Sequence, residues 1–234
     1  MANIPSIDDE IYVEKVIQSI MNFSRRLKTP KNINPLTEHF KISSSNVFGQ
    51  NIMNYLFEGT NDTKQLEERC QSALHHIESS KRKVVALIEK KIVKKSIVMT
   101  ASYSPLIIDS LKEAKKFQKI FHVAVLETRP FMEGRRTAQE LSKNDLDVHY
   151  FIDQAARVIT KKADICLLPC NHITNEGKIY TFLGGEMIAE LCHKRNVALY
   201  ILTNGWKFDG KNIFKYDEKR TKEAIWEKAP KNVT

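Results

Sequence analysis

A short segment of the chain combines arginines with residues that start a helix. The segment, ETRPFMEGRRTAQEL, covers residues 127–141. Gly134 would open a helix there, and the free backbone N–H groups and dipole of a helix N-terminus attract an anion. Three side chains add fixed positive charge: Arg129, Arg135 and Arg136. The segment therefore predicts a turn that captures a phosphate group.

The same arginines also admit a purely structural interpretation. Glu127 and Glu133 lie in the same segment and can pair with them. Surface ion pairs of that kind are common and involve no ligand. Because the spacing fits both interpretations, the sequence leaves both open.

The other reactive residue types form no comparable group. The four cysteines have no CxxC pairing and are expected to be free thiols, most of them packed in apolar stretches: Cys70, Cys166, Cys170 and Cys192. Cys170 and His172 follow the strand predicted at residues 165–168, and in an extended chain they would share one face, which leaves a thiol–imidazole pair open. Two ligands do not make a zinc site, and the remaining histidines are scattered. We predict no metal site and no cofactor.

Composition narrows the class of protein. The 234 residues are 42% hydrophobic and 28% charged, which suits a globular fold. No apolar run approaches the ~20 residues of a membrane span, and the N-terminus lacks the features of a secretory signal, so we expect a cytoplasmic protein without a membrane partner. The net charge of +9 attracts polyanions. However, the basic residues are mostly lysine pairs at expected helix ends, and direct nucleic-acid binding is not predicted.

The hydrophobic pattern changes near residue 95. Residues 1–95 carry apolar side chains at helical spacing and predict a helical N-terminal region. The expected boundaries are a capping box at Ser6 and Asp9, a turn at residues 30–35, a helix end at Gly59, a helix start at Asp62 or Thr63, and a break near Ser79 and Ser80.

Residues 96–234 alternate between short apolar runs and helical stretches. The expected strands are residues 97–99, 123–126, 148–152, 165–168 and 197–202, and the expected helices lie near residues 106–117, 134–141, 154–160 and 183–193. Such alternation predicts an α/β fold with a Rossmann-like, doubly wound, mainly parallel sheet. Ligands of such sheets bind beyond the carboxyl ends of the strands, so functional residues are expected in the turns there.

The arginine segment also resembles a family signature, ETRPxxxGxxxTAxEL, with one residue fewer in the second gap. The family comprises the alpha, beta and delta regulatory subunits of translation initiation factor 2B, methylthioribose-1-phosphate isomerase and archaeal ribose-1,5-bisphosphate isomerase. Ordered matches extend over roughly residues 82–226, including IVMTASYS at 97–104 and FIDQAA at 151–156. The resemblance implies a helical N-terminal region followed by a Rossmann-like domain.

The isomerases of this family use a cysteine and an aspartate as an acid–base pair that opens a sugar phosphate and moves its carbonyl. The matching positions here are Ser102 and Asn171. A neutral amide is no general base, and a serine hydroxyl titrates far above neutral pH without a partner. The resemblance therefore implies a non-catalytic protein with a regulatory or assembly role, like the initiation-factor subunits. The alternatives are a diverged aldose–ketose isomerase that uses Cys170, His172 or Asp153, and a protein without a small ligand.

The strand ends and the resemblance together indicate where a ligand would bind. The candidate ligand- or phosphate-binding residues are Thr100, Ser104, Arg129, Gly134, Arg135, Arg136, Asp153, Gly184 and Lys207. The family's asparagine and lysine near the sugar phosphate are replaced by Thr181 and Phe182. The implied partners are a second copy of the chain in a homodimer, a phosphorylated sugar or nucleotide, and translation-factor subunits.

Overall fold

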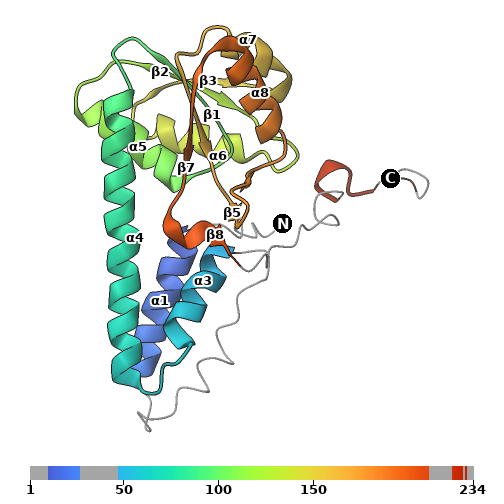
Figure 1. Ribbon diagram of the computed structural model, residues 1–234. Coiled ribbons are helices and arrows are strands. Elements are labelled where there is room, and N and C mark those ends of the chain that lie inside the picture. The colour runs from blue at the N-terminus through green and yellow to red at the C-terminus, as the bar shows by residue number, and fades with distance from the viewer. Residues whose placement is uncertain (1–9, 27–46, 211–222, 229, 231–234) are drawn as a thin grey trace. The chain divides into compact units, whose positions relative to one another are not determined.

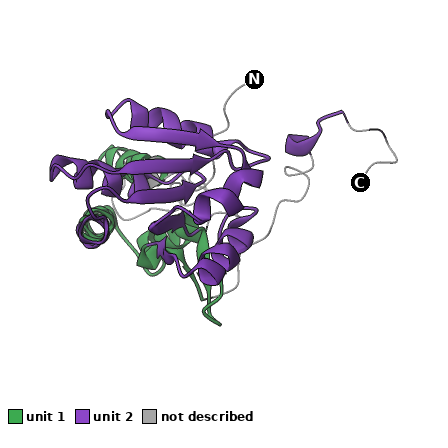
Figure 2. Ribbon diagram, turned by 90° about the horizontal axis from the view of Figure 1, so that it is seen from above, with its two compact units in different colours: residues 1–82, 171–179, 204–215 green, residues 83–170, 180–203, 216–234 purple. Residues whose placement is uncertain are grey.

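The computed structural model describes residues 10–26, 47–210, 223–228 and 230 (Figure 1). The chain divides into two compact units, which Figure 2 distinguishes by colour. We call residues 1–82, 171–179 and 204–215 the helical unit, and residues 83–170, 180–203 and 216–234 the α/β unit. The predicted capping box at Ser6 and Asp9 and the turn at residues 30–35 lie outside the described residues.

Three amphipathic helices of the helical unit lie within the described residues. They are α1 (Glu10–Ser24), α3 (Val47–Phe57) and α4 (Thr63–Lys91), the last of which continues into the α/β unit. Their apolar faces form one buried cluster that includes Val13, Ile17, Ile20, Phe48, Ile52, Leu56, Leu66 and Cys70. These positions recur at the spacing of one helix face, so burial of that face stabilises the helices.

The helix boundaries follow local capping chemistry. Asp62 Oδ1 accepts a hydrogen bond from Gln65 N at 2.8 Å, as expected for a residue that caps α4. Gly59 has a φ of +69°, the left-handed conformation that ends a helix. The predicted break at Ser79 and Ser80 is wrong, because α4 runs unbroken to Lys91. The Ser79 hydroxyl donates to the His76 carbonyl within the helix, so its polar group needs no break.

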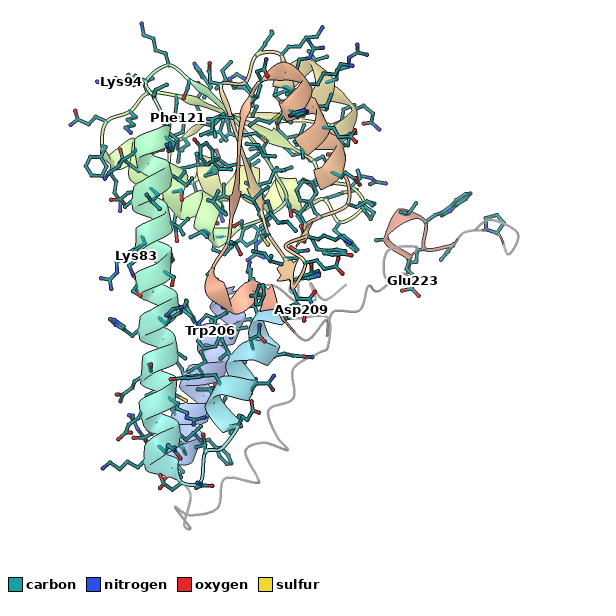
Figure 3. All side chains as sticks on the ribbon, viewed as in Figure 1. Lys83, Lys94, Phe121, Trp206, Asp209 and Glu223 are labelled. Carbon is teal, nitrogen blue, oxygen red and sulfur yellow. The ribbon has the colours of Figure 1, made fainter. Side chains whose placement is uncertain are left out.

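Two later segments of the chain complete the helical unit. Strand β5 (His172–Thr174) pairs in parallel with β8 (Phe208–Asp209), and β6 (Ile179–Tyr180) borders β5. In the chain, the 3₁₀ helix η2 (Gly205–Lys207) directly precedes β8. Asn51 of α3 donates from Nδ2 to the carbonyls of Trp206 and Phe208, at 2.8 Å each. The Trp206 ring, labelled in Figure 3, packs against Tyr55 and His76.

The α/β unit is built on a five-stranded parallel sheet with the order β3-β2-β1-β4-β7. Its strands are β1 (Ile97–Ala101), β2 (His122–Leu126), β3 (Asp147–Phe151), β4 (Ile165–Pro169) and β7 (Ala198–Leu202). All five were predicted as strands from their apolar runs, and the α/β fold after a helical N-terminal region is confirmed.

Helices cover both faces of this sheet, as Figure 1 shows. One face packs against α5 (Pro105–Lys116), α6 (Glu133–Ser142) and the last turns of α4, with Leu111, Val123 and Leu167 in the shared core. The other face packs against η1 (Asp153–Ala155), α7 (Ala156–Thr160) and α8 (Gly185–Arg195). Burial on both faces explains why the inner strands β1, β2 and β4 are mainly apolar, whereas the edge strands β3 and β7 are more exposed.

All four cysteines are free and buried, as predicted. Among the residues that the structure describes, no helix has the length and apolar character needed to cross a membrane.

Candidate functional site

The loop after β2 carries the signature arginines and is held by one carboxylate. Asp153, at the start of η1, accepts hydrogen bonds from Thr128 N at 2.8 Å and from Arg129 N at 2.7 Å. Thr128 has a φ of +62°, so its backbone is in a conformation that non-glycine residues rarely adopt. The Arg129–Pro130 peptide bond is cis. Asp153 therefore positions this loop at the carboxyl edge of the sheet.

Gly134 lies where the loop enters α6, and its lack of a side chain is a packing requirement. A Cβ at this position would lie 1.7 Å from the Leu126 carbonyl oxygen. The Gly134 N–H donates to Glu127 O at 3.1 Å, and the Arg135 N–H donates to Met132 O at 3.0 Å. These two amides are therefore engaged within the loop, and the role of the helix start in anion binding stays a prediction.

Two of the three arginines have protein partners in the structure. The Arg135 guanidinium contacts Glu127 Oε1 from Nη2 at 2.6 Å and also donates to the Tyr150 hydroxyl. The Arg136 guanidinium stacks over the Tyr103 ring, with its Cζ 3.6 Å from the ring centroid. The structural interpretation of the segment thus holds for Arg135.

Arg129 differs from the other two arginines. Its side chain is exposed and acts on Glu127 through its charge, as one of the weaker influences that lower the pKa of that carboxylate, while its backbone N–H donates to Asp153. Arg129 is therefore the arginine of the segment that is best placed to meet a ligand from solution.

The Glu127–Arg135–Tyr150 network sets the charge state of its carboxylate. The hydrogen bond from Arg135 lowers the pKa of Glu127 below its usual value, although burial opposes this shift. The hydrogen bonds to Tyr150 and Glu127 raise the pKa of Arg135. Burial raises the pKa of the Tyr150 hydroxyl, which stays neutral at physiological pH. The network is consequently an ionised pair with a neutral phenol beside it.

We expect this network to make the stability of the protein depend on acid pH. Because the pKa of Glu127 is lower in the folded chain, its stabilising effect is present above about pH 4.3, the ordinary glutamate pKa, and is lost as the pH falls through the folded value. Arg135→Ala should therefore reduce the loss of unfolding free energy between pH 5 and pH 3, measured by urea denaturation. Arg157→Ala, at an exposed position of α7, is the control. Equal losses in both variants would contradict this prediction.

The position of the isomerase cysteine is occupied by a serine with a carboxylate partner. Ser102 directly follows β1, has a φ of +64° and is buried. Its hydroxyl donates a short hydrogen bond to Glu133 Oε2, its N–H donates to Thr128 Oγ1, and its carbonyl accepts from Thr137 Oγ1. The sequence did not predict the Glu133 contact, which joins a strand end to a helix start. Asn171, the position of the isomerase aspartate, is half-buried and belongs to the helical unit.

Three other predicted binding residues have structural roles. The Thr100 hydroxyl is fully buried and donates to Leu167 O at 2.8 Å, which ties β1 to β4. Ser104 caps α5 by accepting a hydrogen bond from Ile107 N. Gly184 precedes α8 with a φ of +95°. Their part in ligand binding stays a prediction.

The remaining candidates belong to different units. Lys207 is buried at the end of η2 in the helical unit. Cys170 is fully buried in the α/β unit, whereas His172 is buried in the helical unit. Burial lowers the pKa of His172, and the nearby Asp209 carboxylate opposes that shift. His172 therefore favours its neutral form.

The comparisons with known proteins agree with this architecture. A relative from Pyrococcus furiosus, named for its likeness to eIF-2B subunit 2, is 25% identical over 152 residues, which are 65% of this chain and 55% of that protein. The ribose 1,5-bisphosphate isomerase of Thermococcus kodakarensis is 30% identical over 135 residues, 58% of this chain and 42% of the isomerase. The chain thus spans about half the length of these relatives.

Solved structures share the fold. The translation initiation factor eIF-2B of Pyrococcus horikoshii OT3 superimposes with a TM-score of 0.78 at 21% identity, over 88% of this chain and 76% of that one. A chain of the tetrameric eIF2B-beta2-delta2 complex from C. thermophilum gives a TM-score of 0.71 at 17% identity, over 88% of this chain and 73% of that one. The pattern of the initiation factor 2 subunit family matches residues 12–232, nearly the whole sequence. This chain therefore belongs to the initiation factor 2 subunit family.

Proposed function

We propose that this protein is a non-catalytic member of its family that binds a phosphorylated sugar or nucleotide and acts in regulation or assembly. The observation that carries the proposal is the replacement of both isomerase acid–base groups, by Ser102 and Asn171. A buried serine and an amide offer no group that exchanges a proton near neutral pH. The related proteins named for eIF-2B subunits support a role beside translation-factor subunits or a second copy of the chain.

The proposed ligand contact lies at the loop after β2. The Arg129 side chain is exposed there, and its backbone N–H is held by Asp153. The guanidinium therefore extends into solvent from a fixed backbone position. A guanidinium on a fixed backbone suits a phosphate because it donates two parallel hydrogen bonds to its oxygens. Arg135 and Arg136 add positive potential beside this position, even though each is held by its own partner.

Ligand binding is tested by thermal shift against ribose 1,5-bisphosphate, methylthioribose 1-phosphate, AMP, GMP and inorganic phosphate. A ligand at a hundred times its dissociation constant stabilises the folded protein by about 2.7 kcal/mol, which is readily detected. We expect one sugar phosphate or nucleotide to raise the melting temperature of the wild type and not that of Arg129→Ala. Arg157→Ala removes an exposed arginine from α7 and should respond like the wild type. No shift with any of the compounds would argue for a protein without a small ligand.

A diverged isomerase is the second candidate, and one contact favours it. Glu133 places a carboxylate against the Ser102 hydroxyl, at the position where the isomerases have their cysteine. A carboxylate is able to exchange protons in an aldose–ketose isomerisation. Asp153 is less suited, since both of its oxygens accept backbone hydrogen bonds.

Turnover separates the two candidates. We expect no conversion of ribose 1,5-bisphosphate or methylthioribose 1-phosphate above a protein-free blank. Conversion by the wild type that is abolished in Glu133→Gln, but kept in Glu140→Gln on the same helix, would instead establish the isomerase.

Sedimentation velocity of the same samples tests the proposed homodimer, for which the exposed Met187 of α8 offers an apolar contact.

A further inference from the structure

Two histidines and an aspartate lie together on one face at the amino-terminal end of the main sheet. His122 begins β2, Asp147 begins β3, and the two residues are in register. His122 Nδ1 lies 2.6 Å from Asp147 Oδ2, and His149 Nε2 lies 3.5 Å from Asp147 Oδ1. The two imidazole rings have their centroids 5.7 Å apart. One potential ligand atom from each of the three residues lies within 4.8 Å of the others.

The sheet geometry keeps these side chains together. Residues two apart on a strand point to the same face, so Asp147 and His149 share the face onto which their in-register neighbours project. Further along that face, Ala124 and Phe151 pack into the core under α7 and α8. At the strand starts, in contrast, the side chains of His122, Asp147 and His149 are 47%, 57% and 57% exposed. The group is therefore held together by the register of the paired strands β2 and β3 and is accessible from water.

This combination of donor atoms suits a transition metal. Neutral imidazole nitrogens and a carboxylate oxygen are ligands of Zn²⁺, at about 2.0–2.2 Å in a tetrahedral arrangement. Two ligand atoms of such a site lie about 3.3 Å apart, as follows from those bond lengths. The separation of His149 Nε2 and Asp147 Oδ1 already has this size. The shorter contact of His122 to Asp147 is a hydrogen bond, which a small rotation of the exposed His122 ring would open.

We propose that His122, Asp147 and His149 form a surface site for a divalent transition metal, with Zn²⁺ as the ion it takes. Water fills the fourth position. Three exposed ligands without a covering shell give weaker binding than a closed structural zinc site, so we expect a dissociation constant in the micromolar range. The site lies on the strand starts and does not depend on the proposed ligand at the strand ends.

Isothermal titration of the full-length, tag-free chain with ZnCl₂ tests the site. We expect one ion per chain, and at least about tenfold weaker binding by His149→Ala and by His122→Ala. His193→Ala removes an exposed histidine from α8 and should bind like the wild type. Circular dichroism verifies that the variants are folded, which we expect because both ligand side chains are about half exposed. Equal affinity of the wild type and the His122→Ala, His149→Ala double variant would overturn the proposal.

Cobalt distinguishes this site from binding by the cysteines. A Co²⁺ ion held by two imidazoles and a carboxylate shows ligand-field bands without the intense near-ultraviolet charge transfer of a cobalt–thiolate bond. We expect the thiolate band to be absent and the ligand-field bands to disappear in His149→Ala. A thiolate band that persists in this variant would place the metal at a cysteine and contradict the assignment.

Discussion

Gly134→Ala is expected to destabilise the α/β unit by about 3 kcal/mol or more. The added Cβ would lie 1.7 Å from Leu126 O and 2.8 Å from Leu126 C, so the backbone of β2 or the start of α6 has to move. Both elements are fixed on either side, because Leu126 is buried in the sheet and Thr137 of α6 donates to Ser102 O. Urea denaturation followed by circular dichroism measures the effect.

Gly205→Ala is the matched control for this substitution. The nearest atom to a Cβ at Gly205, apart from its chain neighbours, is His76 Nε2 at 4.0 Å, and its φ is not in the left-handed region. We expect a change within about 0.5 kcal/mol. If Gly134→Ala were equally mild, the close approach of α6 to β2 would not be a feature of the folded protein.

Asp153→Ala is expected to have the second largest effect, a loss of about 3 kcal/mol in unfolding free energy. The carboxylate accepts two backbone hydrogen bonds, and each bond to a charged group is worth about 1.5–3 kcal/mol. Thr128 is also buried and has a positive φ, so water does not take the place of Asp153 as the hydrogen-bond acceptor for its N–H. The arginine loop would lose its support, and we expect the variant also to lose the thermal shift proposed for a phosphorylated ligand.

Two further variants make this prediction specific. Asp153→Asn keeps one acceptor oxygen and should fall between the wild type and Asp153→Ala in stability. Glu190→Ala removes an exposed carboxylate from α8 and should leave both stability and ligand response unchanged. A stability of Asp153→Ala within about 0.5 kcal/mol of the wild type would show that the loop holds its conformation without this carboxylate.

The sequence predicted the sheet because each central strand is an apolar run. Residues 165–169 are buried along their whole length, and such an apolar run is recognisable in the sequence without knowing which strands pair with it. In contrast, β5 and β8 have three and two residues, too few to show a period. The Asn51 side chain donates to the carbonyls of Trp206 and Phe208, each more than 150 residues away in the chain, and no local pattern indicates such a contact.

The candidate site was predictable only where local chemistry determines it. The pairing of Arg135 with Glu127 agrees with one of the two interpretations that the sequence left open, because both residues lie in one segment. Two other contacts join residues from separate elements: Ser102 with Glu133, and Thr128 with Asp153. Both depend on positive φ angles, at Ser102 and Thr128, that the local sequence does not predict. The His122–Asp147 pair required the register of β2 and β3, although each residue begins a strand that was itself predictable.

The two hydrogen bonds of Asn51 have a consequence for how the chain is made. Protein synthesis proceeds from the N-terminus, so α1, α3 and most of α4 leave the ribosome long before the carbonyls of Trp206 and Phe208 exist. During that interval Tyr55 and His76 also lack the indole ring that packs against them. The α/β chain between α4 and Trp206 is synthesised before Trp206 itself, and most connections between its strands are short. The nascent protein thus completes the packing around Asn51, Tyr55 and His76 only after the whole main sheet has been synthesised.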